Sequence, residues 1–424
     1  MDWRAYKPLI LPSIPNLREI EVYEQHGGYE QFKRVLREMS PAQVIEEVKA
    51  ANIRGRGGAG FNAGLKWSFM PPPKPGIPRY LAANGDESEP GTFKDRRILE
   101  FNPHLFIEGS LIAAYAMQIN AIYVYVRGEY ADWIGILQKA VDQAYEKGYI
   151  GENILGSSFS THLFIHRGAG AYICGEETGL MESLEGKRAY PRYKPPFPAQ
   201  KGLWGCPTTI NNIETLAHVP IVLRLGAAAY TQIGAADHPG PILYGISGHV
   251  NRPGLYEYPS GMLITDLIYE VAGGIRQGKR LKGVIPGGSS TPILKAEEIE
   301  GVRMSTDSLR KVGTMMGTAG MLVLDEETDM VRLAYRIAAF YKHESCGQCT
   351  PCREGTGWLK QILHRFLEQT ATYADIDRLL SVAEQMEGRT ICALADAAVW
   401  PIRAIVQKYR NEFERVARPA LIPV

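Results

Sequence analysis

Apolar and polar residues follow two different periods along the first 240 residues. Apolar side chains three and four positions apart predict helices, and short runs rich in β-branched and aromatic residues predict strands. The predicted helices cover residues 41–48, with Ser40 as N-cap, 105–117 and 132–147, and the predicted strands cover 79–84, 121–126 and 161–165. Because helices and strands alternate, we expect an α/β domain with a mostly parallel sheet over residues 1–240.

The pattern changes near residue 241. An apolar run at 242–250 is followed by the turn signal Pro253-Gly254 and by a short helical pattern at 263–268. Short strands that are separated by turn residues and accompanied by one helix predict a compact sheet domain. We expect a small β-grasp, or ubiquitin-like, domain over residues 241–328.

From residue 329 onward, helical spacing continues to the end of the chain. Four stretches place apolar residues three and four apart, namely 331–341, 357–369, 375–387 and 397–413. Four helices with short links are typical of a small bundle. We therefore expect a C-terminal four-helix bundle over residues 329–424, with cysteines at the joints between its helices.

Composition narrows the class of protein. Lys and Arg (47) nearly balance Asp and Glu (46), so no overall positive field favours nucleic acid or anionic lipid as a partner. The most apolar region, 105–126, is interrupted by Glu108, Gln118 and Asn120 and lacks the ~20 apolar residues that a membrane-spanning helix needs. The N-terminus has no basic region followed by an apolar one, as a secretory signal would. We expect a cytosolic chain that meets a membrane only through partners.

Cysteine spacing is the strongest chemical signal. Cys346, Cys349 and Cys352 follow the pattern C-x2-C-x2-C, and Cys392 lies forty residues later. Three thiolates at this spacing with a distant fourth are typical of a [4Fe–4S] cluster. A structural zinc site also accepts four thiolates, but it more often uses two separated C-x2-C pairs. We interpret Cys174 and Cys206, which lie apart from this set, as packed small residues.

A glycine-rich segment at 54–61 reads Arg-Gly-Arg-Gly-Gly-Ala-Gly-Phe and is followed by Lys66. It contains the spacing G-x-G-x-x-G, but a helix rather than a strand is predicted before it, so an ordinary Rossmann dinucleotide site is not expected. The backbone N–H groups of such a loop can hold a phosphate, to which Lys66 adds a positive charge. The alternative is a flexible surface loop.

Two further segments carry polar groups that suit a ligand. Residues 84–94 place three carboxylates, an amide and a hydroxyl after a predicted strand, where α/β proteins position their sites, although a solvated acidic turn or a Mg²⁺ site has the same composition. Residues 168–177 combine small side chains, which admit a flat ring closely, with Glu176 and Glu177, which accept hydrogen bonds from ribityl or ribose hydroxyls. The paired amides Asn211-Asn212 suit a flavin. A glycine-rich turn that caps a helix is the alternative for the second segment.

These segments carry a resemblance to a known family. The runs 168–183 and 344–355 are signatures by which the chain resembles the flavoprotein subunit of bacterial respiratory complex I (the 51 kDa family of NADH-quinone oxidoreductase), and the resemblance extends from about residue 20 to 415. Diaphorase subunits of NAD-linked hydrogenases and formate dehydrogenases are also similar. Many of these carry ferredoxin-like or thioredoxin-like extensions with additional cysteines, and none occurs in this sequence, so complex I is favoured.

The resemblance implies a function and a set of site residues. NADH would deliver a hydride to FMN, which would pass single electrons to one [4Fe–4S] cluster. The implied FMN-binding residues are Gly55, Gly57, Lys66, Asn84, Asp86, Glu87, Ser88, Gly175, Glu176, Glu177, Asn211 and Asn212. The implied NADH-binding residues are Phe61, Phe69, Glu89, Tyr172, Glu177, Lys194 and Phe197, and the implied cluster ligands are Cys346, Cys349, Cys352 and Cys392. No side chain beyond the flavin is expected to be catalytic.

Partners and nucleotide preference follow from the same resemblance. We expect a small thioredoxin-like [2Fe–2S] subunit and a larger multi-cluster iron–sulfur subunit as partners, in a complex on the cytoplasmic side of the plasma membrane. The carboxylates of Glu87, Glu89, Glu176 and Glu177 should make the nucleotide site acidic. Because a 2′-phosphate would be repelled there, we expect NADH to be preferred over NADPH, with Glu177 nearest to the adenosine ribose.

Overall fold

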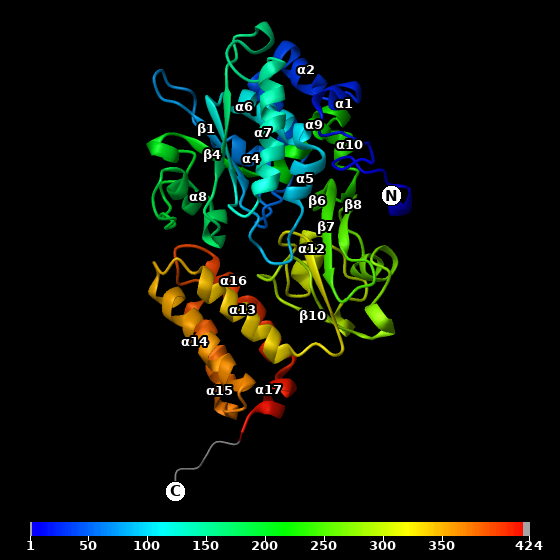
Figure 1. Cartoon of the computed structure of the whole chain (residues 1–424), viewed down its shortest axis with the longest axis vertical. Helices are drawn as coiled ribbons and strands as arrows, with labels where there is room; N and C mark the ends of the chain where they lie inside the picture. Colours follow the sequence, from blue (N-terminus) through cyan, green and yellow to red (C-terminus); the bar gives the residue numbers. More distant parts are fainter. Residues whose placement is uncertain (1, 419–424) are drawn as a thin grey trace.

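The computed structural model describes residues 2–418, and three parts of the chain lie against one another in it (Figure 1). An α/β part comes first, a mixed-sheet part follows, and a helical part ends the described residues. Residue 1 of the expected first domain and residues 419–424 of the expected last domain lie outside the described residues.

The first part is built on a four-stranded sheet in the order β3-β2-β1-β4, and all neighbouring strands run parallel. Its strands are β1 (Tyr80–Gly85), β2 (Ala121–Val126), β3 (His162–Arg167) and β4 (Thr208–Asn212). The first three were predicted from their apolar residues, whereas the polar sequence of β4 gave no strand signal. β1 and β4 pair Asn84 with Asn212, which brings two of the predicted site residues to the same edge of the sheet.

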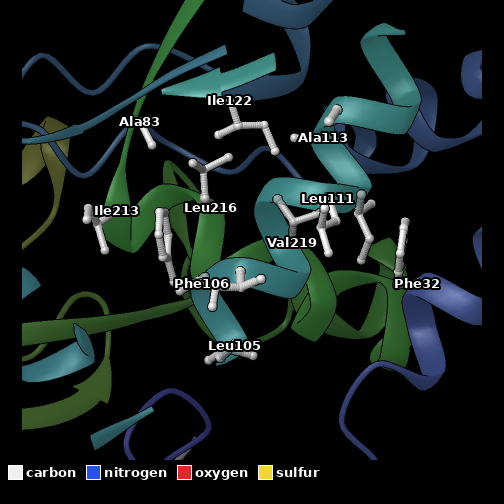
Figure 2. Packing of buried hydrophobic residues seen from close by; sticks show 14 of the residues in the cluster. Phe32, Ala83, Leu105, Phe106, Leu111, Ala113, Ile122, Ile213, Leu216 and Val219 are labelled. Atoms are coloured by element: carbon white, nitrogen blue, oxygen red, sulfur yellow. The ribbon is translucent and has the colours of Figure 1, made fainter. Parts of the chain in front are cut away.

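Helices cover both faces of this sheet. They are α1 (Ile20–Gln25), α2 (Glu30–Glu38), α3 (Pro41–Ala50), α4 (Ala63–Trp67), α5 (Asp95–Phe101), α6 (Pro103–Met117), α7 (Ala131–Glu146), α8 (Glu177–Leu184), α9 (Ile213–Leu225) and α10 (Ala227–Tyr230). Every residue of α6 except Tyr115 is buried, because the helix is enclosed by the sheet on one side and by other helices on the rest. Figure 2 shows this core, in which Phe106 and Leu111 of α6 lie near Leu216 and Val219 of α9.

Local signals explain how the glycine-rich segment is placed. Ser40 and Gln43 form a capping box that begins α3, as the N-cap prediction required. The chain leaves α3, passes through the glycine-rich segment and enters α4 before it reaches β1. A helix therefore precedes the glycines, and the prediction that no Rossmann βα turn forms here is confirmed.

The second part contains a five-stranded sheet in the order β10-β9-β11-β7-β8. Its strands are β7 (Pro241–Gly248), β8 (Gly254–Pro259), β9 (Leu281–Ile285), β10 (Leu294–Lys295) and β11 (Gly320–Asp325), of which β11 and β7 are parallel and the other neighbours antiparallel. The predicted helix begins as α11 (Ile264–Asp266) and continues as a π-helical turn to Val271. The short strands β5 (Gly234–Ala235) and β6 (His238–Pro239) precede this sheet, and α12 (Thr306–Lys311) lies within its connections.

The third part is helical, as predicted. It consists of α13 (Met330–Glu344), α14 (Thr350–Leu367), α15 (Tyr373–Met386), α16 (Leu394–Lys408) and α17 (Arg410–Val416), which share one apolar core.

Two predicted helix boundaries in this part were wrong. The helix expected from residue 357 begins at Thr350, because Pro351 is tolerated in a first turn, and Cys352 therefore lies inside α14 instead of in a link. The helix expected over 397–413 is interrupted at Tyr409, whose hydroxyl donates to the carbonyl oxygen of Lys282 in β9. This contact ties the helical part to the second sheet.

Across residues 2–418, no helix is both long enough and apolar enough to cross a bilayer.

The closest backbone approach in the first core gives a stability prediction. A Cβ atom on Gly109 of α6 would lie 1.9 Å from the carbonyl oxygen of Leu216 in α9, so Gly109→Ala must push the two helices apart. We expect it to lower the free energy of unfolding by ~1–3 kcal/mol. Gly135 of α7 has no atom within 4 Å of such a Cβ, and Gly135→Ala should instead stabilise the protein by ~0.5–1 kcal/mol. Urea unfolding of both variants measures the difference, and equal effects would contradict the packing described.

Candidate functional site

A cavity of about 400 Å³ lies where the three parts of the chain meet. Eleven predicted site residues line it, namely Gly57, Asn84, Asp86, Glu87, Ser88, Glu89, Tyr172, Gly175, Glu176, Asn212 and Cys392. The second part contributes Ser290, Met315, Gly317 and Thr318, and the third part contributes Ala393, Leu394, Ala397 and Trp400. We call this space the central cavity. Because no single part of the chain encloses it, the site is complete only when all three are packed together.

Eight of the residues predicted to bind FMN or NADH lie outside the lining of the central cavity. Gly55 and Asn211 support it from behind: the backbone N–H of Gly55 donates to the carbonyl of Phe61 (2.8 Å), and Asn211 accepts from the indole N–H of Trp67 (3.0 Å). Phe61, Phe69 and Phe197 have exposed rings, with about half of each side chain accessible to solvent, and the rings of Phe61 and Phe69 are 6.1 Å apart. The last three, Lys66, Glu177 and Lys194, form an ion-pair group.

This ion-pair group changes the expected charge of the nucleotide site. The Glu177 carboxylate lies 3.0 Å from the Lys66 ammonium and 2.6 Å from that of Lys194. Partial burial opposes ionisation, but the two ammonium groups lower the pKa of Glu177 to about 2. Lys194 also contacts Glu176 at 3.3 Å. Two lysines therefore balance two glutamates, and the acidic excess that the sequence suggested around Glu177 is not present.

Two other predicted carboxylates are engaged as helix caps. Glu87 accepts from the backbone N–H groups of Lys94 and Asp95 at the start of α5 (2.8 Å each) and from the hydroxyl of Tyr130 (2.9 Å). Burial, together with the charge of Asp95, raises the pKa of Glu87 to about 7. Glu176 similarly accepts from the backbone N–H of Gly179 (2.9 Å) at the start of α8. Both residues line the cavity while fixing the helix that follows them.

Asp86 has an oxygen available for a ligand. Its Oδ2 atom accepts from the Ser88 hydroxyl (3.0 Å), whereas Oδ1 is buried and has no partner among the described residues. Burial raises the pKa of Asp86 to about 7. A Cβ atom on Gly175 would lie 3.3 Å from Oδ2, so the glycine keeps the space beside this carboxylate open. Because an unpaired buried acceptor is unfavourable, the arrangement fits a ligand with hydroxyl donors, such as the ribityl chain of FMN.

Glu89 joins all three parts of the chain. Its carboxylate accepts from the hydroxyl of Tyr172 (2.8 Å), from the backbone N–H of Ser290 (2.7 Å) and from the hydroxyl of Ser289 (3.3 Å). The Ser289 hydroxyl in turn lies 3.2 Å from that of Tyr341 in α13. Burial raises the pKa of Glu89. This residue, which the sequence suggested only as a nucleotide ligand, is also the centre of the junction between the parts.

The four cysteines of the predicted cluster line a second, narrow cavity together. All are free thiols; the Ser345 hydroxyl lies 3.2 Å from Cys352 Sγ, and the backbone N–H of Ile391 lies 3.5 Å from Cys349 Sγ. Burial raises the pKa of Cys352, and that of Cys392 to about 12. No three Cys, His, Asp or Glu side chains within residues 2–418 are grouped so as to hold a single metal ion. Four thiols around one cavity are the donor set that a [4Fe–4S] cluster uses.

The cysteine cavity and the central cavity share a wall. Ile173, Cys392 and Leu394 line both. The remaining cysteines lie elsewhere: Cys174 is buried in the apolar cluster under α8, as predicted, and Cys206 is half-buried.

Several lining residues were missed by the sequence prediction. Arg56, Lys94 and Asp95 are buried charged residues at the cavity, and the only available signal for the last two was a pair of opposite charges at the end of the acidic segment. Met315, Thr318 and Trp400 come from connections and a helix that gave no local sign of a site.

Comparisons with known proteins agree with this geometry. A family described as the Nuo51 FMN-binding domain matches residues 48–221, the SLBB domain matches 243–294, and a family described as the NADH-ubiquinone oxidoreductase-F iron–sulfur binding region matches 332–416. The first covers the glycine-rich and acidic segments, and the last covers all four cluster cysteines.

Whole proteins are similar as well. The F subunit of NADH-quinone oxidoreductase of Rickettsia felis is 50% identical over 397 residues, which are 93% of each chain, and the F 2 subunit of the Rhizobium meliloti enzyme is 49% identical over 96% of this chain and 97% of its own. Among solved structures, a chain of an NAD⁺-reducing [NiFe]-hydrogenase in the H2-reduced state superposes with a TM-score of 0.82 at 34% identity; the match covers 91% of this chain and 64% of that one. With half of its residues identical along nearly the full length of both sequences, the chain belongs to the family of NADH-quinone oxidoreductase F subunits.

Proposed function

We propose that this chain is the electron-entry subunit of an NADH-quinone oxidoreductase, a flavin-dependent NADH dehydrogenase that carries FMN and one [4Fe–4S] cluster. The observation that carries the proposal is the wall that the central cavity and the cysteine cavity share at Ile173, Cys392 and Leu394. When bound, FMN supplies the conversion between a two-electron hydride from NADH and single electrons for the cluster. The chain supplies the two adjoining sites and the thin apolar wall between them.

The residues proposed to hold FMN act by binding and orientation. Asp86 and Ser88 offer acceptors and a hydroxyl to the sugar-like chain, and Gly57 and Gly175 leave room for close approach. The predicted set beyond these is Gly55, Lys66, Asn84, Glu87, Glu176, Glu177, Asn211 and Asn212. Gly55 and Asn211 do not line the cavity, and they would act by holding Phe61 and Trp67, to which they are hydrogen-bonded.

Nucleotide binding is proposed at the exposed side of the site. Phe61, Phe69 and Phe197 are large aromatic rings left accessible to solvent, which favours stacking with an adenine. Lys194 and Glu177 would lie nearby, and Glu89 and Tyr172 would meet the nicotinamide end. Glu89 already accepts hydrogen bonds from Tyr172 and Ser290, so a bound carboxamide would have to compete with one of these donors.

The cluster is proposed to be ligated by Cys346, Cys349, Cys352 and Cys392. Thiolates buried in apolar surroundings are unfavourable without a cation, as the raised pKa of Cys392 reflects. Iron would supply that charge, and the N–H of Ile391 next to Cys349 would stabilise a sulfur that bears negative charge.

A diaphorase subunit of an NAD-linked hydrogenase or formate dehydrogenase is the second candidate. The structural likeness to a hydrogenase chain favours it, but the identity to that chain is 34%, whereas the identities to the two quinone oxidoreductase relatives are 50% and 49%. The higher identity therefore favours the quinone oxidoreductase.

Domain limits, partners and location extend the same proposal. We propose domains at 1–240, 241–328 and 329–424, with a β-grasp arrangement in the second and a bundle of α13 to α16 in the third. As a subunit of a larger membrane complex, the chain would pass electrons to a small thioredoxin-like [2Fe–2S] subunit and a large multi-cluster subunit on the cytoplasmic side. Co-purification of these subunits with the chain tests this, and recovery of the chain always alone would argue against it.

Asp86 gives a prediction that links stability to pH. Its folded pKa of about 7 lies above the ordinary value of 3.8, so the folded state binds the proton more tightly and stability is lost as pH rises from about 4 to 7. Asp86→Asn removes this penalty and should stabilise flavin-free protein by up to ~4 kcal/mol at pH 8, with a gain that shrinks below pH 7. The same change should weaken FMN binding, because an acceptor is lost. Urea unfolding at pH 5 and pH 8 and a fluorescence titration with FMN measure both; a gain independent of pH would contradict the assignment.

The cysteines give a second prediction. Cys349→Ser or Cys392→Ser should abolish the iron–sulfur EPR signal while much of the flavin remains bound, because most of the flavin site lies outside the helical part. Cys206→Ser is the matched control, since this thiol lies outside both cavities, and it should leave the signal unchanged. An unaltered EPR spectrum in Cys392→Ser would place the fourth ligand elsewhere.

A third prediction concerns NADH against NADPH. Glu177→Gln should raise the NADPH-to-NADH ratio of kcat/KM by roughly tenfold, because Lys66 and Lys194 lose their carboxylate and become free to meet a 2′-phosphate. Glu185→Gln is the control, because Glu185 is likewise held by two cations, Lys187 and Arg192, but belongs to a different ion-pair group. Steady-state kinetics with both nucleotides measure the ratio. If it does not move, the ribose does not lie at Glu177.

A further inference from the structure

A group of buried charges lies at the wall of the central cavity, beside the residues already proposed to hold FMN. Lys94 lines the cavity, yet only 3% of its side chain is exposed. Its ammonium lies 2.7 Å from the Asp95 carboxylate and 2.9 Å from that of Glu214, which does not line the cavity. A lysine is almost never buried to this degree unless it is paired, so the two carboxylates keep it in place and charged.

The charge state of this group is fixed by its geometry. Burial alone would lower the pKa of Lys94, but Asp95 and Glu214 raise it above its ordinary value. Burial likewise opposes ionisation of Glu214, and the Lys94 ammonium nevertheless lowers the pKa of Glu214 to about 2. Lys94 is therefore a permanent cation at any physiological pH.

Asn212 is held by the same group. Its Oδ1 atom accepts from the Lys94 ammonium (3.2 Å) and from the backbone N–H of Glu214 (3.0 Å), and its Nδ2 donates to Asp95 (2.6 Å). An ammonium only donates and a carboxylate only accepts, so the amide has one possible orientation. A Cβ atom on Gly57 would lie 3.3 Å from Cβ of Asn212, and the position of Asn212 therefore also limits where the glycine-rich segment can run.

We propose that Lys94 is a positioning residue for the flavin: it fixes the Asn212 amide at the cavity wall, and its permanent positive charge favours the two-electron-reduced state of the bound cofactor. The inference rests on the proposed FMN site. Reduction by hydride adds one negative charge to the flavin ring while NADH becomes NAD⁺. Because the Lys94 side chain is almost fully buried at the cavity wall, solvent screens its charge less than that of a surface cation, and the ammonium can stabilise the added negative charge.

The test is Lys94→Met in the full chain, assembled in its complex. We expect FMN to dissociate at least tenfold more readily in a fluorescence titration. We also expect the ratio of reduced to oxidised flavin at a given potential to fall at least tenfold, which for a two-electron couple moves the midpoint potential by about 30 mV to more negative values. Lys94→Arg keeps the charge and should return the potential toward that of the wild type.

A control separates this effect from simple loss of a buried charge. Glu108 is a buried carboxylate that accepts from the Tyr23 hydroxyl (2.5 Å) and does not line the central cavity. Glu108→Gln removes a buried charge away from the cavity and should leave the flavin potential unchanged. A wild-type potential in Lys94→Met, whatever its melting temperature, overturns the proposal.

Lys94→Met leaves two carboxylates unpaired and can fail to fold, because a broken buried ion pair is strongly destabilising. The double variant Lys94→Met with Glu214→Gln removes the pair as a unit and keeps the net charge. Lys94 lines the cavity and Glu214 does not. The flavin midpoint potential of the double variant should therefore still lie below that of the wild type, by a smaller shift than in Lys94→Met alone. A wild-type potential in the double variant again overturns the proposal. Failure of NADH to bleach the flavin of the wild-type protein would instead refute the proposed function itself.

Discussion

The Glu89 carboxylate is the contact on which the arrangement of the molecule depends. It is half-buried, and it accepts hydrogen bonds from Tyr172 of the first part and from Ser289 and Ser290 of the second, while Ser289 reaches Tyr341 of the third. A largely desolvated carboxylate that lost these donors would be left with unsatisfied oxygens, which is unfavourable. This polar centre therefore connects all three parts in the relative position in which they form the central cavity.

Around this centre, charge is balanced locally instead of accumulating. Glu177 is matched by Lys66 and Lys194, and Lys94 is matched by Asp95 and Glu214. Glu87 and Glu176 are stabilised by the N–H groups of the helices that they cap. The site thus contains many ionised groups that are paired. Among the groups that line the cavity, the unpaired oxygen of Asp86 and the ammonium of Lys94 are those proposed to act on the ligand.

The sequence predicted the local features well and the assembled ones poorly. Ser40 as a cap, the apolar strands β1 and β2 and the three-plus-one cysteine spacing are encoded within a few residues, and the structure contains them. The charge around Glu177 was misjudged because Lys66 is 111 positions away in sequence, and only the fold brings the two together. Strand β4 was missed because its residues are polar: they serve the site at the sheet edge, and their pairing with β1 provides the strand. Met315, Thr318 and Trp400 were also missed, because only the fold brings them to the cavity from segments that are distant in sequence.

The contribution of residues 392–400 to the central cavity bears on how the protein matures. These residues follow all the other lining residues in the sequence, so until they have been synthesised the space that later holds the flavin is open on one side. The sheet with its glycine-rich segment can fold earlier, but it presents only a partial surface to a cofactor. Tight retention of flavin and assembly of the cluster both then depend on this late segment, and a chain truncated before Cys392 would lose both even though most of the residues proposed to contact FMN would still be present.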